Sequence, residues 1–593
     1  MALFTPSASP AITVREIDLT GVAPNVTTST GAIVGNFRWG PVNERTLVSD
    51  ESGLVTAFAA PDDDNAVDFL SAAYFLKYSN AAYIVRGNNG GINAHSAVTK
   101  LTGDSAVVDN LTDWETNFEN SVGEAGIATG TWIAKYPGVL GNGLTVSWCP
   151  ATTADSAFDN WTYAGSFDAA PGTSAYAEAR GGSNDEVHVA VIDRTGVFSG
   201  TPGSVLETFP FVSVSPGAAT PDGSPNYISE VITQSSQYIY NGYFGDDSAF
   251  GSSFEGLGAN WGVESTVDSN VDYASDMSGW NDTLASQNLG GGVASSDLTT
   301  GQVAVAFDLF EDTETVTVDF LIAPQRTSQS DQTTVVNDLV SIATGRKDCV
   351  VVTSPNRTAV VGSPTQAADA VTFANTLTNS SYLVVDNNFL KVFDKYNDRY
   401  VNIPAASSTA GLMAATDLVA GPWFSPAGQR RGNYLGVTDI VANPNKSNRD
   451  TLYKAGVNPI ANIPGQGVIL FGDKTHERRP SAFDRINVRR LFLAVERSIA
   501  EAAKNVMFEF NDEFTRAEFV NIVEPLLREV QGRRGIIDFR VVCDETNNTP
   551  AVVDRNEFIA SIFIKPARSI NYVTLNFVAV RTGVDFEEVV GTV

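Results

Sequence analysis

Cysteine is nearly missing from this chain of 593 residues, which contains only Cys149, Cys349 and Cys543. An odd number of cysteines, spaced about 200 residues apart, does not form the paired framework of a disulfide-stabilised secreted domain. Each cysteine has apolar neighbours in the sequence. We therefore predict three buried free thiols.

Long hydrophobic runs are also missing. The sequence has no uncharged apolar stretch of about 18 residues, the length that a membrane-spanning helix requires. The first ten residues contain no basic side chain and no apolar run that would suit a signal peptide. We expect a soluble protein that is made in a cytoplasm and does not insert into a membrane.

Basic side chains are scarce in the first part of the chain. Residues 195–325 contain 17 Asp or Glu and no Lys or Arg, and 28 of the 38 basic residues lie in 346–593. The formal net charge of −30 argues against nucleic-acid binding, which needs a basic surface. Two interpretations of the acidic segment stay open. It could be a solvated domain that keeps the protein soluble at high local concentration, or a cation-binding or salt-adapted surface.

Sequence motifs of catalysis and metal binding are missing as well. The histidines His95, His188 and His476 lie far apart, and no His-Glu-x-x-His, Cys-x-x-Cys or phosphate-binding loop occurs. His188 alternates with valines, which is typical of a hydrogen-bonded histidine in a strand. The acidic run 62–64 precedes a predicted helix, where carboxylates stabilise the helix N-terminus. We predict no enzyme, no metal site and no cofactor.

The composition that remains is that of a folded protein, with 43% hydrophobic and 18% charged residues. Its length predicts about three or four domains. Strand-like runs at 31–35 and 83–86 flank a predicted helix over 67–77, which begins after Asp64 or Asn65. These elements are the beginning of an α/β domain.

The same α/β pattern resumes far along the chain. Strands are predicted at 316–322 and 348–353, with a helix over 332–343 between them. Between the two α/β regions, Gly, Ser, Asp, Thr and aromatic residues dominate, and runs such as 187–192 predict β structure. We predict a mixed α/β core, formed by N- and C-terminal parts, into which an acidic β-rich protruding domain is inserted.

The C-terminal region has the clearest periodicity. A one-sided amphipathic helix is predicted by residues that recur at helical spacing, namely Val488, Leu491, Phe492, Val495 and Ile499. Thr515 and Glu518 have the spacing of a capping box, which predicts a second helix that ends at Gly532. Strands are predicted at 536–542, 558–564 and 572–580.

Both ends of the chain carry strand-like runs with no partner nearby in the sequence. An isolated strand leaves backbone groups unpaired, and pairing with the sheet edge of a neighbouring molecule would satisfy them. We predict extended terminal arms of this kind, while an arm folded onto its own core stays an alternative. The residues assigned to the inter-subunit arms are Ile12, Val14, Ile17, Tyr572, Val573, Leu575 and Phe577.

Several short motifs, taken in order, resemble the tail sheath family of contractile-tailed bacteriophages. They include Gly35-Asn-Phe-Arg-Trp-Gly-Pro41, Lys135-Tyr-Pro-Gly138, Pro422-Trp-Phe-Ser-Pro-Ala-Gly428, Phe471-Gly-Asp-Lys-Thr475, Phe483-Asp-Arg-Ile-Asn-Val-Arg-Arg-Leu-Phe492 and Pro566-Ala-Arg-Ser-Ile-Asn-Tyr572. The resemblance covers most of 30–90 and 316–593 and is weak across the inserted segment. Each motif is short, but eight or more in the same order make a chance match improbable.

The resemblance implies a structural subunit of the virion. Such subunits form a homo-oligomer of six-fold rings, stacked in a helical sheath around a tail tube protein, with baseplate and tail terminator proteins as further partners. The sheath contracts by lattice rearrangement and drives the tube through the host envelope. A competing interpretation, suggested by the acidic middle segment, is a secreted or surface β-rich adhesin that binds calcium.

The predicted organisation follows from the pattern and the resemblance together. It comprises an N-terminal arm (1–22), a first core part (23–95), the inserted acidic domain (96–315), a second part of the middle α/β domain (316–445) and a C-terminal sheath domain with the arm strand (446–593). Two interpretations of a basic cluster stay open: contact with an acidic tube, or internal pairs with Asp484 and Glu496. The cluster consists of Arg478, Arg479, Arg485, Arg489, Arg490 and Arg497.

Overall fold

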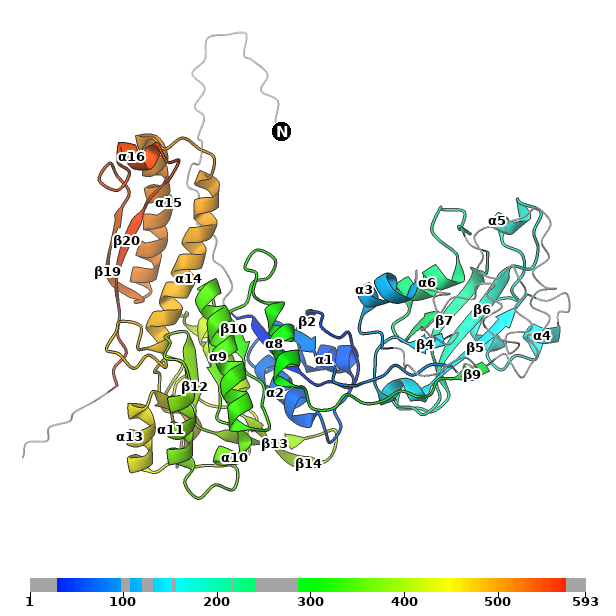
Figure 1. Ribbon diagram of the computed structural model, residues 1–593, viewed down its shortest axis with the longest axis horizontal. Coiled ribbons are helices and arrows are strands. Elements are labelled where there is room, and N and C mark those ends of the chain that lie inside the picture. Colours follow the sequence, from blue (N-terminus) through cyan, green and yellow to red (C-terminus); the bar gives the residue numbers. More distant parts are fainter. Residues whose placement is uncertain are drawn as a thin grey trace, which may run out of the picture. The chain divides into compact units, whose positions relative to one another are not determined.

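The computed structural model describes residues 29–96, 107–119, 132–151, 156–215, 217–241 and 286–571, whose helices and strands are shown in Figure 1. These residues form two compact units. The larger unit contains the described residues up to 419 together with 426–486, and the C-terminal unit contains 420–425 and 487–571. The chain therefore passes between the two units three times.

A seven-stranded sheet forms the centre of the larger unit. Its strands, in spatial order, are β16 (Val457–Asn458), β12 (Leu383–Asp386), β11 (Val350–Thr353), β10 (Phe320–Ile322), β1 (Gly31–Gly35), β3 (Ala82–Arg86) and β2 (Thr46–Val48). All pairs are parallel except β2 with β3. Gly31 is paired with Ala82 on one side and with Phe320 on the other. Segments far apart in the sequence thus share one sheet, which confirms the predicted α/β core.

Helices cover both faces of this sheet. They are α1 (Glu51–Phe58), α2 (Ala66–Leu76), α8 (Thr300–Asp308), α9 (Gln329–Arg346), α10 (Arg357–Val360), α11 (Gln366–Thr376), α12 (Ala406–Val419) and α13 (Lys446–Lys454). On one face, Phe307 of α8 and Leu339 of α9 share an apolar core with Val351. On the other face, α2 packs so closely that a Cβ on Gly31 would lie 2.6 Å from the ring of Phe75, so this position requires glycine.

Helix α2 is more deeply buried than its sequence pattern indicates. The prediction placed only one face of the helix in the core, yet Phe69, Ala72 and Ala73 are buried together with Leu70. The reason is that α2 contacts the sheet strands as well as α12 and β14 (Arg399–Pro404). A helix between two packed layers buries most of its circumference.

A four-stranded antiparallel sheet lies in the inserted segment. Its order is β7 (Ser204–Ser213), β6 (Glu186–Asp193), β5 (Leu144–Pro150) and β9 (Ser286–Asn288). Beside it are the pair β4 (Trp132–Ala134) and β8 (Ile239–Asn241) and the short helices α3 (Leu111–Asp113), α4 (Ser156–Asp159), α5 (Ala175–Glu178) and α6 (Ile228–Ser235). Trp132, Val146 and Val189 belong to a separate apolar core. The β character predicted for this segment is confirmed.

The chain returns to the α/β core with helix α8, because Val303 and Phe307 pack with the strands of the seven-stranded sheet. Helix α8 thus already belongs to the core, although it precedes residue 316. The division of the chain into five domains stays a prediction. Small sheets complete the larger unit: β13 (Phe389–Asp394) with β14 and β15 (Asp439–Ile440), and the hairpin β17 (Ile460–Ile463) with β18 (Gly467–Leu470).

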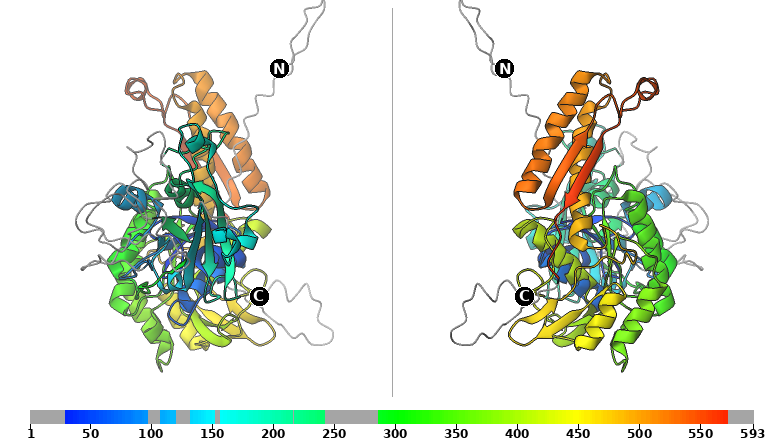
Figure 2. Two further views of the ribbon diagram at one scale, coloured as in Figure 1. Left: turned by 90° about the vertical axis from the view of Figure 1, so that its right-hand side faces the viewer. Right: turned by 90° about the vertical axis from the view of Figure 1, so that its left-hand side faces the viewer.

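The C-terminal unit consists of two helices packed beside two strands (Figure 2). These are α14 (Ile486–Ala503), α15 (Glu513–Gly532), β19 (Ile536–Val542) and β20 (Ser561–Pro566), with a short helix α16 (Pro550–Val553) between the strands. Both predicted helices, the end of the second at Gly532 and the strand at 536–542 are confirmed. The predicted strand at 558–564 is shifted, since β20 begins at Ser561.

The predicted states of the cysteines and of His188 can be compared with the structure. All three cysteines are buried and free, as predicted. His188 is buried in β6, where Nε2 contacts the carbonyl of Ala169 and Nδ1 accepts from the backbone N–H of Phe211. Among the residues in the described ranges, no helix is long and apolar enough to cross a membrane.

Candidate assembly site

The sheet of the C-terminal unit has only two strands in the part of the chain that the structure describes. Strand β19 pairs antiparallel with β20, with Phe539 opposite Ile564 and Val541 opposite Ile562. Each strand therefore has one partner, and its other edge has no partner strand among the described residues. An open edge presents unpaired backbone N–H and C=O groups, which can accept a further strand.

One face of this two-stranded sheet packs on the helices and is only partly covered. Phe539, Val541, Ile562 and Ile564 are half-buried against a core formed by α14 and α15. Two strands span about 10 Å across the sheet, whereas two adjacent helices span about 20 Å. The sheet is therefore too narrow for the helical layer, and strands added at its edges would cover the remaining apolar surface.

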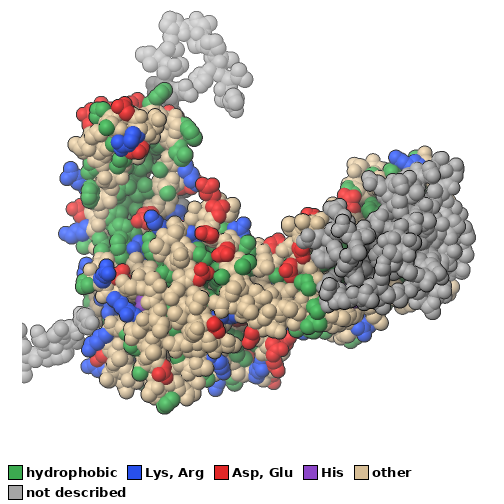
Figure 3. Space-filling view, viewed as in Figure 1, with side chains coloured by type: hydrophobic (Ala, Val, Ile, Leu, Met, Phe, Trp, Pro, Cys, Tyr) green, Lys and Arg blue, Asp and Glu red, His purple; other side chains and the backbone are tan. Residues whose placement is uncertain are grey.

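The outer face of the sheet carries apolar as well as charged side chains. Phe563 is 61% exposed and Ile537 is 57% exposed. In Figure 3, hydrophobic side chains gather over the C-terminal unit on the face that is shown. Apolar area of this kind is typical of a surface that another molecule covers.

The two helices that support the sheet are held by a regular apolar seam. Leu491 and Val495 of α14 pack with Phe519, Val523 and Leu527 of α15. These residues recur every four positions along each helix, so each helix presents one apolar stripe to its neighbour. Pro525 lies on the exposed side of α15, where the loss of its backbone donor is least costly.

The cap of α15 differs from the sequence prediction. Thr515 and Glu518 do not form the N-terminal capping box, because the helix begins three residues earlier. Asp512 is the N-cap, and its carboxylate accepts a hydrogen bond of 2.8 Å from the backbone N–H of Thr515. Hydrogen bonds to this carboxylate lower the pKa of Asp512, so it is charged at neutral pH.

We expect the substitution Asp512→Ala to lower the free energy of unfolding by about 1 kcal/mol, because a helix N-cap contributes that much. Urea denaturation followed by far-ultraviolet circular dichroism measures the change. The matched control is Asp554→Ala, since Asp554 is also exposed and follows α16 rather than capping a long helix. Equal stabilities of the two variants would contradict the assigned cap.

Segment 420–425 belongs to the C-terminal unit although it is distant in sequence. The indole N–H of Trp423 donates to the carbonyl of Arg533 at 3.1 Å, and the guanidinium of Arg533 lies 5.0 Å from the Trp423 ring centroid. Asn487 also donates to the carbonyl of Trp423. These contacts fix the segment beside the C-terminal ends of α15 and the start of α14.

The predicted arm residues cannot be placed in this fold. Ile12, Val14 and Ile17, and likewise Tyr572, Val573, Leu575 and Phe577, lie outside the described residues. Strand β20 ends six residues before Tyr572. The arms stay a prediction.

The basic cluster is divided between the two units. Arg478, Arg479 and Arg485 belong to the larger unit, whereas Arg489, Arg490 and Arg497 belong to the C-terminal unit. Arg478 and Arg479 are exposed, but Arg489 and Arg490 are only 7% and 5% exposed. The cluster is thus not a single exposed stripe within either unit, and its role as a tube-facing surface stays a prediction.

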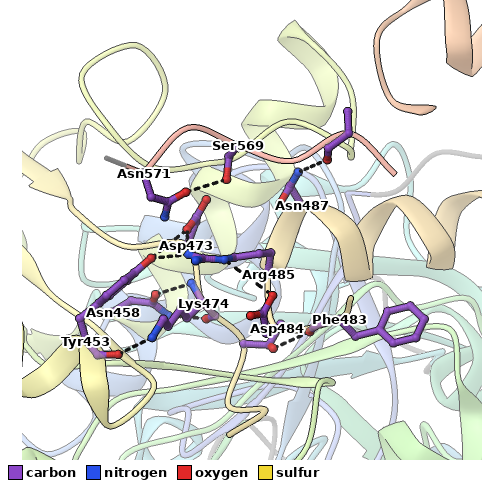
Figure 4. A network of polar contacts seen from close by, with 12 residues as sticks. Tyr453, Asn458, Asp473, Lys474, Phe483, Asp484, Arg485, Asn487, Ser569 and Asn571 are labelled. Atoms are coloured by element: carbon purple, nitrogen blue, oxygen red, sulfur yellow. Dashed lines mark hydrogen bonds and ion pairs between the residues drawn. The ribbon is translucent and has the colours of Figure 1, made fainter. Parts of the chain in front are cut away.

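Arg485 has carboxylate partners within the larger unit (Figure 4). Its guanidinium lies 3.0 Å from Asp473 and 3.7 Å from Asp484, and it also contacts the hydroxyl of Tyr453. The pair with Asp484 is one of the internal pairs that the sequence analysis left open. Nearby, the Lys474 ammonium donates to the carbonyl of Tyr453, and burial together with the Arg485 cation lowers the pKa of Lys474.

No group of three His, Cys, Asp or Glu side chains in the described ranges is arranged to hold a metal ion. The acidic run 62–64 has structural contacts instead. Asp62 pairs with Arg38 at 3.0 Å and accepts from the backbone N–H of Asp64, while Asp63 pairs with Arg399 at 2.7 Å.

One surface feature was missed by the sequence reasoning. The turn between α14 and α15 exposes Met507, Phe508, Phe510 and Phe514. The signal was present as aromatic residues that alternate with acids and Asn between two amphipathic helices.

Comparison with known proteins supports the α/β architecture and then identifies the family. The sheath tail protein of Listeria innocua has a similar fold, with a TM-score of 0.53 and 12% identity over 93% of this chain and 98% of that chain. The model of the phage tail sheath protein central domain matches residues 291–476, and the model of the phage tail sheath C-terminal domain matches 478–579.

Curated relatives match nearly the whole chain. The tail sheath protein of Enterobacteria phage T4 is 32% identical over 98% of this chain and 99% of its own length. The tail sheath protein of Salmonella phage ViI is 33% identical over 99% and 98%, and that of Vibrio phage KVP40 is 31% identical over 98% and 99%. The chain belongs to the tail sheath proteins of contractile-tailed bacteriophages. It is a structural component of the virion, and its function is that of a contractile sheath subunit.

Proposed function

We propose that this subunit polymerises around the tail tube by completing β-sheets in neighbouring copies. The observation that carries the proposal is the two-stranded sheet β19–β20, whose apolar face is too narrow for the helices that it covers. The N-terminal run Ile12–Ile17 and the C-terminal run Tyr572–Phe577 are the donor strands. Rings of six copies, stacked helically and bounded by baseplate and terminator proteins, are the assembly that this exchange builds.

Strand exchange also supplies a connection that survives contraction. Each added strand contributes roughly four to six hydrogen bonds, worth about 0.5–1.5 kcal/mol each. Linked contacts strengthen one another in a lattice, because each link raises the effective concentration of the next. The arms keep copies connected while the folded units change their packing, and the free energy of contraction comes from the difference between two packings rather than from catalysis.

Deleting residues 1–20 tests the proposal. We expect a folded protein that no longer polymerises, since the donor strand is lost while every described element is retained. Circular dichroism checks the fold, and negative-stain electron microscopy checks for tubes. Normal sheaths from the truncated chain would show that the arm is not needed.

A more specific variant keeps the N-terminal arm and removes only some of its backbone hydrogen-bond donors. The double substitution Thr13→Pro with Arg15→Pro removes two N–H donors, and proline is not tolerated in a central strand. The matched control, Thr13→Ala with Arg15→Ala, keeps both donors. We expect tubes from the alanine variant and none from the proline variant.

A further inference from the structure

The turn between the two long helices of the C-terminal unit exposes an unusual set of side chains. Met507, Phe508, Phe510 and Phe514 are 60%, 101%, 83% and 74% exposed. Glu509, Asp512 and Glu513 lie between them in the sequence and are also exposed. We call residues 507–514, which include the first two residues of α15, the acidic aromatic turn.

The turn is held in place rather than loosely attached. Asn511 donates to the carbonyl of Glu557 at 2.8 Å, and its side-chain oxygen accepts from Arg516 at 3.2 Å. The backbone N–H of Asp512 donates to the carbonyl of Phe510 at 2.9 Å. Phe508 has a φ of 71°, a conformation that a bulky residue adopts only where its surroundings impose it.

An anchored turn that presents aromatic side chains to solvent has the character of an interface anchor. Large aromatic side chains dominate binding energies when a partner buries them, and a contiguous exposed apolar patch is rare on a protein that stays monomeric. The acids around the patch define the partner chemically. It must offer an apolar spot that is surrounded by cations.

The larger unit offers such a surface. Phe471 is 48% exposed, and the guanidinium of Arg449 lies 5.5 Å from its ring centroid. Lys446, one turn earlier on α13, is exposed on the same side of that helix. Arg430 is exposed at the tip of loop 428–432, which is bonded to Leu470 at both ends. We call Arg430, Lys446, Arg449 and Phe471 the basic face.

The charge distribution of the chain indicates which part of a second copy could bind the acidic aromatic turn. Residues 1–345 carry 41 acidic and 10 basic side chains, whereas residues 346–593 carry 27 acidic and 28 basic ones. The net charge of the first part repels an acidic turn, whereas most of the cationic sites that would attract it lie in the second part. The basic face is a site of this kind that also exposes an aromatic ring.

We propose that the acidic aromatic turn of one copy docks on the basic face of a second copy. The proposal rests on the assembly of copies proposed above but requires neither terminal arm. The two surfaces differ, so the contact is heterologous, and heterologous contacts propagate into rings or helices instead of closing as a dimer. The aromatic side chains provide the buried area, and the charges fix the orientation.

Charge reversal on each side tests the pairing. One variant carries Glu509→Arg and Glu513→Arg in the turn, and the other carries Arg430→Glu and Arg449→Glu in the basic face. Each variant alone juxtaposes like charges, so we expect its assembled fraction to fall at least roughly tenfold. Light scattering and negative-stain electron microscopy of the purified full-length chain measure the assembled fraction.

The decisive measurement is the equal mixture of the two variants. In the mixture, every turn meets a basic or acidic face of opposite charge on the other variant, so we expect assembly to return. We expect the same of a single chain that carries all four substitutions, which we call the fourfold variant. The control, Glu311→Arg with Glu314→Arg, reverses two exposed acids of the larger unit and leaves assembly unchanged.

Three results would overturn the proposal. Normal assembly of either reversed variant would mean that the contact is not used. Failure of both the mixture and the fourfold variant would place the partner of the turn elsewhere, for example on the tube. Rescue in the fourfold variant but not in the mixture would place the contact within one chain. None of these results depends on the arms, which the proline variant tests separately.

Discussion

Replacing Arg86 with methionine is expected to lower the free energy of unfolding of the larger unit by about 3–5 kcal/mol. The Arg86 guanidinium is 1% exposed and donates to the carbonyl of Gly40 at 2.8 Å and to that of Pro137 at 2.5 Å. Methionine would fill most of the space but would leave two buried acceptors without a donor, which costs roughly 1–3 kcal/mol each.

The Arg86 contacts join β3 of the seven-stranded sheet to the Lys135-Tyr-Pro-Gly138 motif of the inserted segment. Gly138 has a φ of 140°, and a Cβ there would lie 3.0 Å from the carbonyl of Arg38. Burial lowers the pKa of Arg86 to about 10, which still leaves it charged at neutral pH. We therefore expect Arg86→Met to loosen the motif as well as the sheet.

Urea denaturation measures the stability change, and hydrogen exchange at residues 135–138 measures the loosening. The exposed Arg357 serves as the control, because its guanidinium makes one long contact of 3.4 Å with the carbonyl of Asn402. Arg357→Met should change stability by less than about 0.5 kcal/mol. If Arg86→Met lowered the free energy of unfolding by no more than Arg357→Met does, the role assigned to Arg86 would be contradicted.

The second large effect concerns Asp386, which is the last residue of β12 and is fully buried. Burial raises the pKa of Asp386 to about 7, although hydrogen bonds from Asn388, Ser354 and Thr409 oppose the shift. The folded chain thus holds a proton on this carboxyl where the unfolded chain, with an ordinary pKa near 4, has released it. Between about pH 4 and pH 7, folding takes up a proton.

The sign of the pH dependence follows from that uptake. The contribution of Asp386 to stability is complete below about pH 4, falls by roughly 1.4 kcal/mol per pH unit as the pH rises, and stays low above about pH 7. Asparagine cannot ionise and keeps the oxygen that accepts from the Asn388 N–H. Asp386→Asn should therefore be more stable than the natural chain near pH 8, by a few kcal/mol, and similar to it near pH 4.

Urea denaturation curves at several pH values measure this difference. The control is Asp450→Asn, because Asp450 is exposed on α13 and should show little pH-dependent change relative to the natural chain. A constant difference between Asp386→Asn and the natural chain at all pH values would contradict the raised pKa.

Much of the architecture could be predicted because local sequence and final structure agree. The run 350–353 consists of three valines and a threonine and forms a buried central strand, and the stripe through Leu491 and Val495 forms the helix that it indicates. The pairing of β1 with β10 could not be predicted from periodicity alone. It joins Gly31 to Phe320 across almost 290 residues, and only the interrupted α/β pattern suggested it.

The candidate site was harder to predict, for physical reasons. Helix α15 has two plausible caps close together, and Asp512 replaces Thr515 because its carboxylate reaches the Thr515 N–H directly. The basic cluster looked continuous in the sequence, yet Arg489 and Arg490 point into the fold as α14 turns. The exposure of Phe508 and Phe510 depends on how the two helices are joined, which composition does not determine.

The short segment 420–425 has a mechanical consequence. Because Trp423 is fastened to Arg533 and Asn487, the C-terminal unit is tethered by the backbone at three junctions, after residues 419, 425 and 486. A force that pulls the C-terminal unit away is therefore divided among three backbone connections instead of acting on one. A protease that cuts the chain after residue 486 would therefore nick the subunit without setting the unit free.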